Sequence, residues 1–147
     1  MLENYLNENT IRVKVSVDDW KQAIRAAGKL LEEEGVINST YTEAMIENGE
    51  VNGAYFVLTP GVAVPHAKSE SGVNRVGMSL ITLDRPVDFL TSPNNPVRLV
   101  ICLAATDNST HIDALRVLAD FLGDEESVSR VMEASGREEA RDIIKNY

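Results

Sequence analysis

The chain has 147 residues, of which 44% are apolar, and it carries a formal net charge of −9. This length suits one domain, residues 1–147, that buries roughly 70% of its unfolded surface. The acidic balance argues against nucleic-acid binding, which needs a basic face. The single cysteine, Cys102, has no partner for an internal disulfide, and neither a signal peptide nor a long apolar span is present. We therefore expect a cytoplasmic protein without membrane insertion.

Strands and helices alternate in the first third of the chain. Residues 11–15 alternate apolar and basic side chains, which predicts a half-buried strand. A capping box at residues 16–19 precedes a helix that starts near Trp20 and stops at Gly35. The next helical pattern begins at Thr40 and is expected to end at about 48–49.

The second part continues this alternation and predicts an α/β domain with a mixed sheet layered by helices. Residues 54–58 and 62–64 favour short strands, and residues 76–83 favour a longer one. Residues 97–105 are almost continuously apolar, which predicts a central strand covered on both faces. The proline-rich segment 85–96 is expected to be a loop or an edge. Three further helices are predicted, at residues 111–122, 125–133 and 137–146.

The segment 59–68 reads TPGVAVPHAK and contains the first of only two histidines. Proline fixes its own φ and keeps the preceding residue extended, so Pro65 should present His66 rigidly at the tip of a short strand. Imidazole is a neutral nucleophile near pH 7, so it can accept a phosphoryl group without a separate base. The alternative is a surface turn that happens to contain a histidine.

The second histidine, His111, is expected in the first turn of a helix capped by Thr110, directly after the most buried strand. In α/β folds such helix N-termini point at sites at the carboxyl ends of strands and favour bound phosphate. The same field disfavours imidazolium, so His111 should be neutral and able to donate one hydrogen bond. If it lies beside His66, one imidazole can take a phosphoryl group while the other stabilises it. The alternative is that His111 merely occupies a helix position.

Other chemistries find little support in the sequence. Two histidines with Asp107 or Asp113 could hold zinc, but no i, i+4 pair of ligands is present, and Cys102 lies in a strand expected to be buried. A buried thiol there is expected to be inert. There is no nucleophile elbow, phosphate-binding glycine loop or dinucleotide fingerprint. We therefore expect neither a metal nor a cofactor.

These residues resemble a known family. The motif GVAVPHA at residues 61–67 resembles the phosphohistidine motif of IIA components of the bacterial phosphoenolpyruvate-dependent sugar phosphotransferase system, of the mannitol/fructose superfamily. The preceding residues 58–61, and the strand at 96–105 followed by Thr110, His111 and an apolar helix, look most like its ascorbate-type subgroup. The resemblance covers nearly the whole chain.

The resemblance implies a fold, partners and residue roles. The family fold is a three-layer α/β/α sandwich with a mixed five-stranded sheet. His66 would accept a phosphoryl group from the phosphocarrier protein HPr and pass it to a cysteine of a IIB component, which serves the membrane transporter IIC. His111, backbone N–H groups and Lys68 would stabilise the phosphoryl group, since no metal takes part.

One feature departs from the family pattern. Mannitol-type members tend to carry an arginine between the second helix and the following strand, but residues 47–53 contain no basic side chain. Asn48 or Asn52 could supply a weaker donor, or Lys68 could compensate from the loop after His66. Lys68 could equally be an ordinary solvated lysine.

Three functions remain open at this point. The first is a phosphotransferase subunit for uptake of a sugar or a sugar acid such as ascorbate. The second is a regulatory phosphohistidine module similar to the nitrogen-related IIA proteins, and the third is a phosphorylatable domain of a larger regulator. Phosphoryl flow to a IIB cysteine separates the first from the second.

Overall fold

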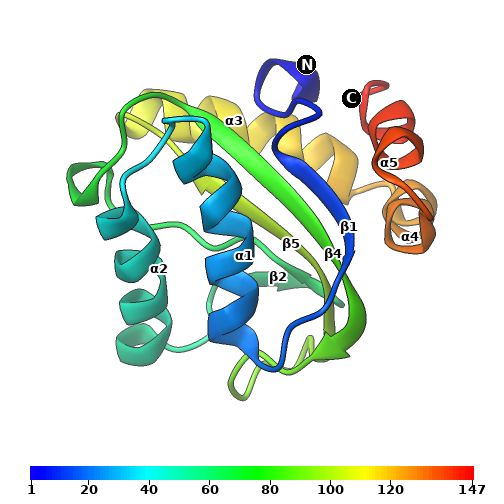
Figure 1. The fold of residues 1–147 in the computed structure, drawn as a ribbon, viewed down its shortest axis with the longest axis horizontal. Coiled ribbons are helices and arrows are strands. Elements are labelled where there is room, and N and C mark those ends of the chain that lie inside the picture. The colour runs from blue at the N-terminus through cyan, green and yellow to red at the C-terminus, as the bar shows by residue number, and fades with distance from the viewer.

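The computed structural model describes all of residues 1–147, and a twisted five-stranded sheet lies at its centre (Figure 1). The strand order is β1-β4-β5-β3-β2. Pairs β1/β4 and β3/β5 are parallel, whereas β4/β5 and β2/β3 are antiparallel, so the sheet is mixed as expected. The predicted apolar strand is confirmed as the central one, β5. The strands are β1 (Ile11–Val15), β2 (Val57–Thr59), β3 (Val62–Ala63), β4 (Gly77–Val87) and β5 (Val97–Ala104).

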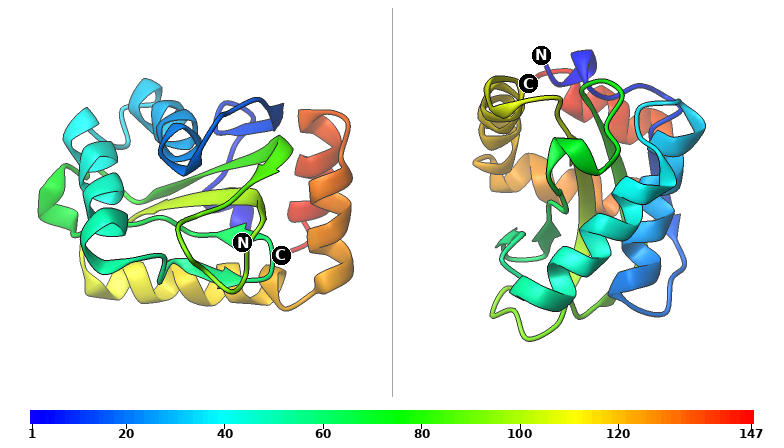
Figure 2. Two further views of the ribbon diagram at one scale, coloured as in Figure 1. Left: turned by 90° about the horizontal axis from the view of Figure 1, so that it is seen from below. Right: turned by 90° about the vertical axis from the view of Figure 1, so that its left-hand side faces the viewer.

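Helices cover both faces of the sheet, which confirms the three-layer arrangement (Figure 2). Helices α1 (Trp20–Glu33) and α2 (Ser39–Asn52) pack on one face, and α3 (Asn108–Leu122) packs on the other. Helices α4 (Glu125–Glu133) and α5 (Arg137–Ile144) join α3 in the hydrophobic core on that face. Alternate residues of β5 serve the two cores: Leu99, Ile101 and Leu103 face α3, while Val100, Cys102 and Ala104 face α1 and α2.

The helix starts differ from the predicted caps. Helix α1 is capped by Asp19, whose carboxylate accepts from the backbone N–H of Gln22, so the predicted box at residues 16–19 is wrong. Helix α3 begins at Asn108 with Asp107 as its N-cap, and Thr110 is its third residue rather than its cap. Asp107 and Thr110 bond reciprocally, because each side chain accepts from the other residue's backbone N–H. His111 therefore lies one turn inside the helix, at its fourth position.

The end of α2 also corrects the prediction, because this helix runs on to Asn52 instead of stopping at 48–49. A Cβ added at Gly49 would approach the Trp20 ring to 2.8 Å, so this glycine permits close packing inside the helix. The break falls at Gly53, which has φ +80°. Most of segment 47–53 is consequently helix. The strand predicted at 54–58 corresponds to β2, which starts only at Val57. Strand β4 likewise extends into the segment expected to be a loop.

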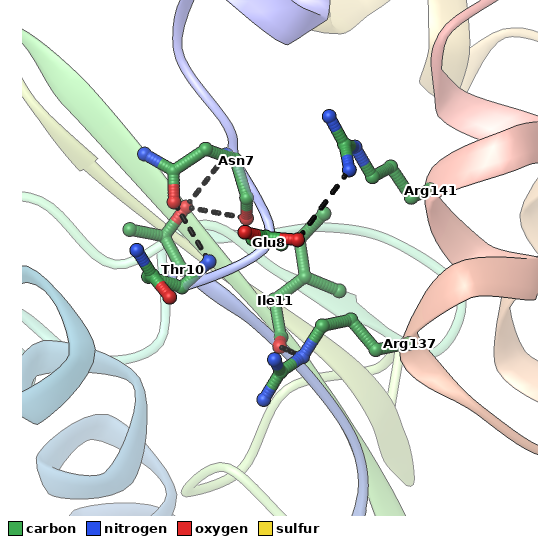
Figure 3. Close-up of polar contacts among 7 residues, drawn as sticks. Asn7, Glu8, Thr10, Ile11, Arg137 and Arg141 are labelled. Atoms are coloured by element: carbon green, nitrogen blue, oxygen red, sulfur yellow. Dashed lines mark hydrogen bonds and ion pairs between the residues drawn. The ribbon is translucent and has the colours of Figure 1, made fainter.

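Helix α5 is attached to the free edge of the sheet at β1 (Figure 3). Arg137 donates from Nε to the carbonyl oxygen of Ile11 at 2.9 Å, and Arg141 pairs with Glu8 at 3.7 Å. No helix of the structure has the length and apolar character needed to cross a membrane.

Candidate active site

His66 follows β3, at the end of the sheet where the carboxyl ends of the parallel strands β3 and β5 lie. The segment is held on both sides, because Val64 N–H bonds to the Phe56 carbonyl at 2.8 Å and Leu103 N–H bonds to the Pro65 carbonyl at 3.1 Å. These bonds fix the backbone directly before the histidine, as the stiff sequence around Pro65 predicts.

One hydrogen bond sets the tautomer of His66. Its Nδ1 lies 2.9 Å from the carbonyl oxygen of Val64. Because a carbonyl oxygen can only accept, Nδ1 must carry the proton. In the neutral ring Nε2 is then the atom with a free lone pair, and it is the nucleophilic nitrogen of this side chain.

The structure brings the two histidines together, although they are far apart in the sequence. The His66 and His111 ring centroids are 5.3 Å apart, with the rings inclined at 52°. Both rings line a cavity of about 340 Å³ between the ends of α2, β3 and β5 and the start of α3. Partial burial lowers the pKa of His111 below its ordinary value, and the charge of His66 lowers it further. His111 is therefore neutral at pH 7, which agrees with the expected state, although burial and His66 cause it and not the helix N-terminus.

Lys68 also lines this cavity, from the loop after His66, where it is exposed. Its ammonium group makes no ion pair or hydrogen bond in the structure. It is the only basic side chain besides the two histidines in the lining. The carboxylate of Asp107 lies at the same opening, and hydrogen bonds from Thr110 lower the pKa of this carboxyl group. No group of three or more His, Cys, Asp or Glu side chains is arranged to hold a metal ion.

Asn48 reaches His66 from the last turns of α2. Its Nδ2 donates to the His66 carbonyl oxygen at 3.2 Å and to the Tyr55 hydroxyl at 2.8 Å. Its Oδ1 accepts from Asn52 Nδ2 at 2.8 Å. Both amide hydrogens of Asn48 are thus used, and Asn52 does not line the cavity. Asn48 and Asn52 therefore position the backbone of His66. Neither offers the free donor into the cavity that was considered as a substitute for the missing arginine.

Tyr41 fixes the other side of the reactive loop. This fully buried residue of α2 donates its hydroxyl to the Leu103 carbonyl at 2.7 Å and accepts from Ala67 N–H at 3.0 Å. Burial raises the pKa of Tyr41 well above its ordinary value, so the hydroxyl stays protonated. Neither Tyr41 nor Tyr55 was predictable as part of the site, because a tyrosine in a sequence carries no sign of what its hydroxyl contacts.

The structure is thus an α/β protein in which two imidazoles lie together where helix α3 begins beside the carboxyl ends of β3 and β5. Residues 4–147 match the family described as "Phosphoenolpyruvate-dependent sugar phosphotransferase system, EIIA 2". The chain belongs to this family.

Curated relatives support the same assignment over nearly the whole length. The mannitol-specific cryptic phosphotransferase enzyme IIA component of Escherichia coli (strain K12) is 37% identical over 145 residues, covering 97% of each chain. The ascorbate-specific IIA component of the same organism is 34% identical, covering 97% of this chain and 94% of that one. The solution structure of the cryptic mannitol protein from Escherichia coli superimposes with a TM-score of 0.91 at 35% identity, over 99% of both chains. The chain is a IIA component of the mannitol/ascorbate type, and these two identities do not separate one sugar from the other.

Proposed function

We propose that this IIA protein carries a phosphoryl group on Nε2 of His66 during uptake of a sugar or a sugar acid such as ascorbate. It accepts the group from phospho-HPr in the cytoplasm and passes it to a cysteine of a IIB component, which serves the membrane transporter IIC. The observation that carries this proposal is the hydrogen bond from His66 Nδ1 to the Val64 carbonyl, which leaves Nε2 as the nucleophile.

The two transfers balance without an added acid or base. In the first, the Nε2–P bond forms as the N–P bond of phospho-HPr breaks. In the second, the thiolate of the IIB cysteine forms an S–P bond as Nε2–P breaks, and His66 returns to its neutral form. Phosphorylated His66 keeps its Nδ1 proton and becomes cationic, and the Val64 carbonyl stabilises that positive charge through the same hydrogen bond. Phosphoryl transfer proceeds through a loose in-line transition state, so positioning and charge stabilisation provide most of the catalysis.

The remaining residues act on the phosphoryl oxygens. Neutral His111 donates one N–H, and its lowered pKa keeps it from competing with His66 for positive charge. The Lys68 ammonium group adds a cation from the exposed side of the cavity, where it is free of a carboxylate partner. Together they replace the charge that a metal ion supplies in many other phosphoryl-transfer enzymes.

The test is phosphorylation with labelled phosphoenolpyruvate, enzyme I and HPr, followed by ³¹P NMR to locate the group. We expect one acid-labile phosphate on Nε2 of His66, no label on His66→Ala, and slower onward transfer to the IIB cysteine from His111→Ala. Label that persists on His66→Ala, or a phosphate on Nδ1, contradicts the proposal. Phosphorylation without transfer to any IIB cysteine instead supports the regulatory role.

A further inference from the structure

Tyr55 lies directly against the reactive histidine, in the connection between α2 and β2. Its ring packs edge-on against the His66 ring, with centroids 5.5 Å apart and planes at 88°. A second edge contact with Phe56, at 5.5 Å, holds the other side of the ring. The residue lines the cavity shared by the two histidines and is 47% exposed.

The direction of the hydrogen bond between Asn48 and Tyr55 follows from its neighbours. The His66 carbonyl can only accept, so the Asn48 atom beside it must be the NH₂ group. The other amide atom of Asn48 is then the oxygen, and it accepts from Nδ2 of Asn52. The NH₂ group of Asn48 also donates to the Tyr55 hydroxyl oxygen. Tyr55 is an acceptor in this bond, and its own O–H proton has no acceptor in the structure.

We propose that the Tyr55 hydroxyl is a catalytic residue that donates its free O–H to an oxygen of the phosphoryl group on His66. This inference rests on the proposed function, because it assumes phosphorylation of His66. Burial raises the pKa of Tyr55, so the hydroxyl keeps its proton at neutral pH.

The hydrogen bonds around Tyr55 strengthen its donor character. Asn52 donates to Asn48, Asn48 donates to Tyr55, and each bond polarises the next group in the same direction. No proton is transferred along this chain. A hydrogen bond from a neutral donor to a charged oxygen corresponds to a factor of about 10 to 100 in an equilibrium or a rate.

Tyr55→Phe tests the proposal, because it removes the hydroxyl and keeps the ring that packs on His66. We expect phosphoryl transfer from phospho-HPr to slow by about 10- to 100-fold. Tyr5→Phe is the matched control, because Tyr5 is also partly exposed and its hydroxyl makes no hydrogen bond in the structure. We expect the control to transfer at the rate of the unmodified protein.

A second readout distinguishes a phosphoryl ligand from a structural support. The unmodified protein, labelled with ¹³C-tyrosine, can be titrated with alkali before and after phosphorylation of His66. The titration midpoint of Tyr55 should be higher in the phosphorylated protein. An unchanged midpoint there overturns the proposal even if Tyr55→Phe folds poorly.

The outcomes of these experiments distinguish failure of the role of Tyr55 from failure of the proposed function. If the unmodified protein is not phosphorylated on His66, the proposed function fails. If it is phosphorylated there, and Tyr55→Phe matches Tyr5→Phe in transfer rate, only the role of Tyr55 fails.

Discussion

Removal of one buried hydroxyl should destabilise the fold and loosen the reactive loop at the same time. In Tyr41→Phe the ring stays and no cavity opens, so the change isolates two hydrogen bonds. The buried Leu103 carbonyl loses its donor, which costs about 1–3 kcal/mol. The Ala67 N–H lies in a partly buried bond where water can replace the hydroxyl, at a cost of about 0.5–1 kcal/mol.

The sum predicts that Tyr41→Phe lowers the free energy of unfolding by about 1.5–4 kcal/mol, out of about 5–15 kcal/mol for an ordinary domain. Urea unfolding followed through Trp20, the only tryptophan, measures the change. The denaturant dependence of the free energy, the m-value, should stay constant, because the surface exposed on unfolding is the same. The amide hydrogen of Ala67 should also exchange faster with solvent.

Tyr5→Phe again supplies the comparison, since it removes a hydroxyl that bonds to nothing. We expect it to stay within about 0.5 kcal/mol of the unmodified protein. If Tyr41→Phe loses no more than this control, or if Ala67 exchange is unchanged, the assignment of Tyr41 as the anchor of the loop is refuted.

Two further predictions concern titrating groups. His111 should titrate by NMR below its ordinary 6.5, and His66→Gln should raise its midpoint without restoring it fully, because burial remains. The unfolded chain then binds the His111 proton more tightly than the folded protein does. His111 therefore leaves the free energy of unfolding unchanged above about pH 6.5 and lowers it as the pH falls below that value. A His111 midpoint at or above 6.5 contradicts this prediction. Burial raises the pKa of Cys102 to about 12, so a thiol reagent at pH 8 should label it only after unfolding. Rapid labelling of the native protein would show that the thiol is accessible.

The sequence predicts the central parts of the fold better than its ends. Strand β5 was predictable because an uninterrupted apolar run needs cover on both faces, and the structure supplies helices on both. The end of α2 was not, because a glycine that stops a helix and one that admits a tryptophan ring look the same in sequence. Gly49 belongs to the second kind, and only the contact with Trp20 shows it.

The same limit applies to the site. The meeting of His66 and His111 was predictable, since each follows a predicted strand, and the parallel pairing of β3 with β5 places those strand ends together. The hydroxyl of Tyr55 was not, because its role depends on Asn48, whose position depends on where α2 ends. Errors at helix ends therefore propagate to the residues that surround the histidines.

Both edge strands of the sheet, β1 and β2, are poor templates for the addition of a strand from another chain. On one side, Arg137 already occupies the outward carbonyl of Ile11, and the cationic Arg12 and Lys14 stand on the same strand. On the other, β2 has three residues and is followed at once by Pro60, which has no N–H to offer. Association by strand addition is thereby discouraged at both edges of the sheet.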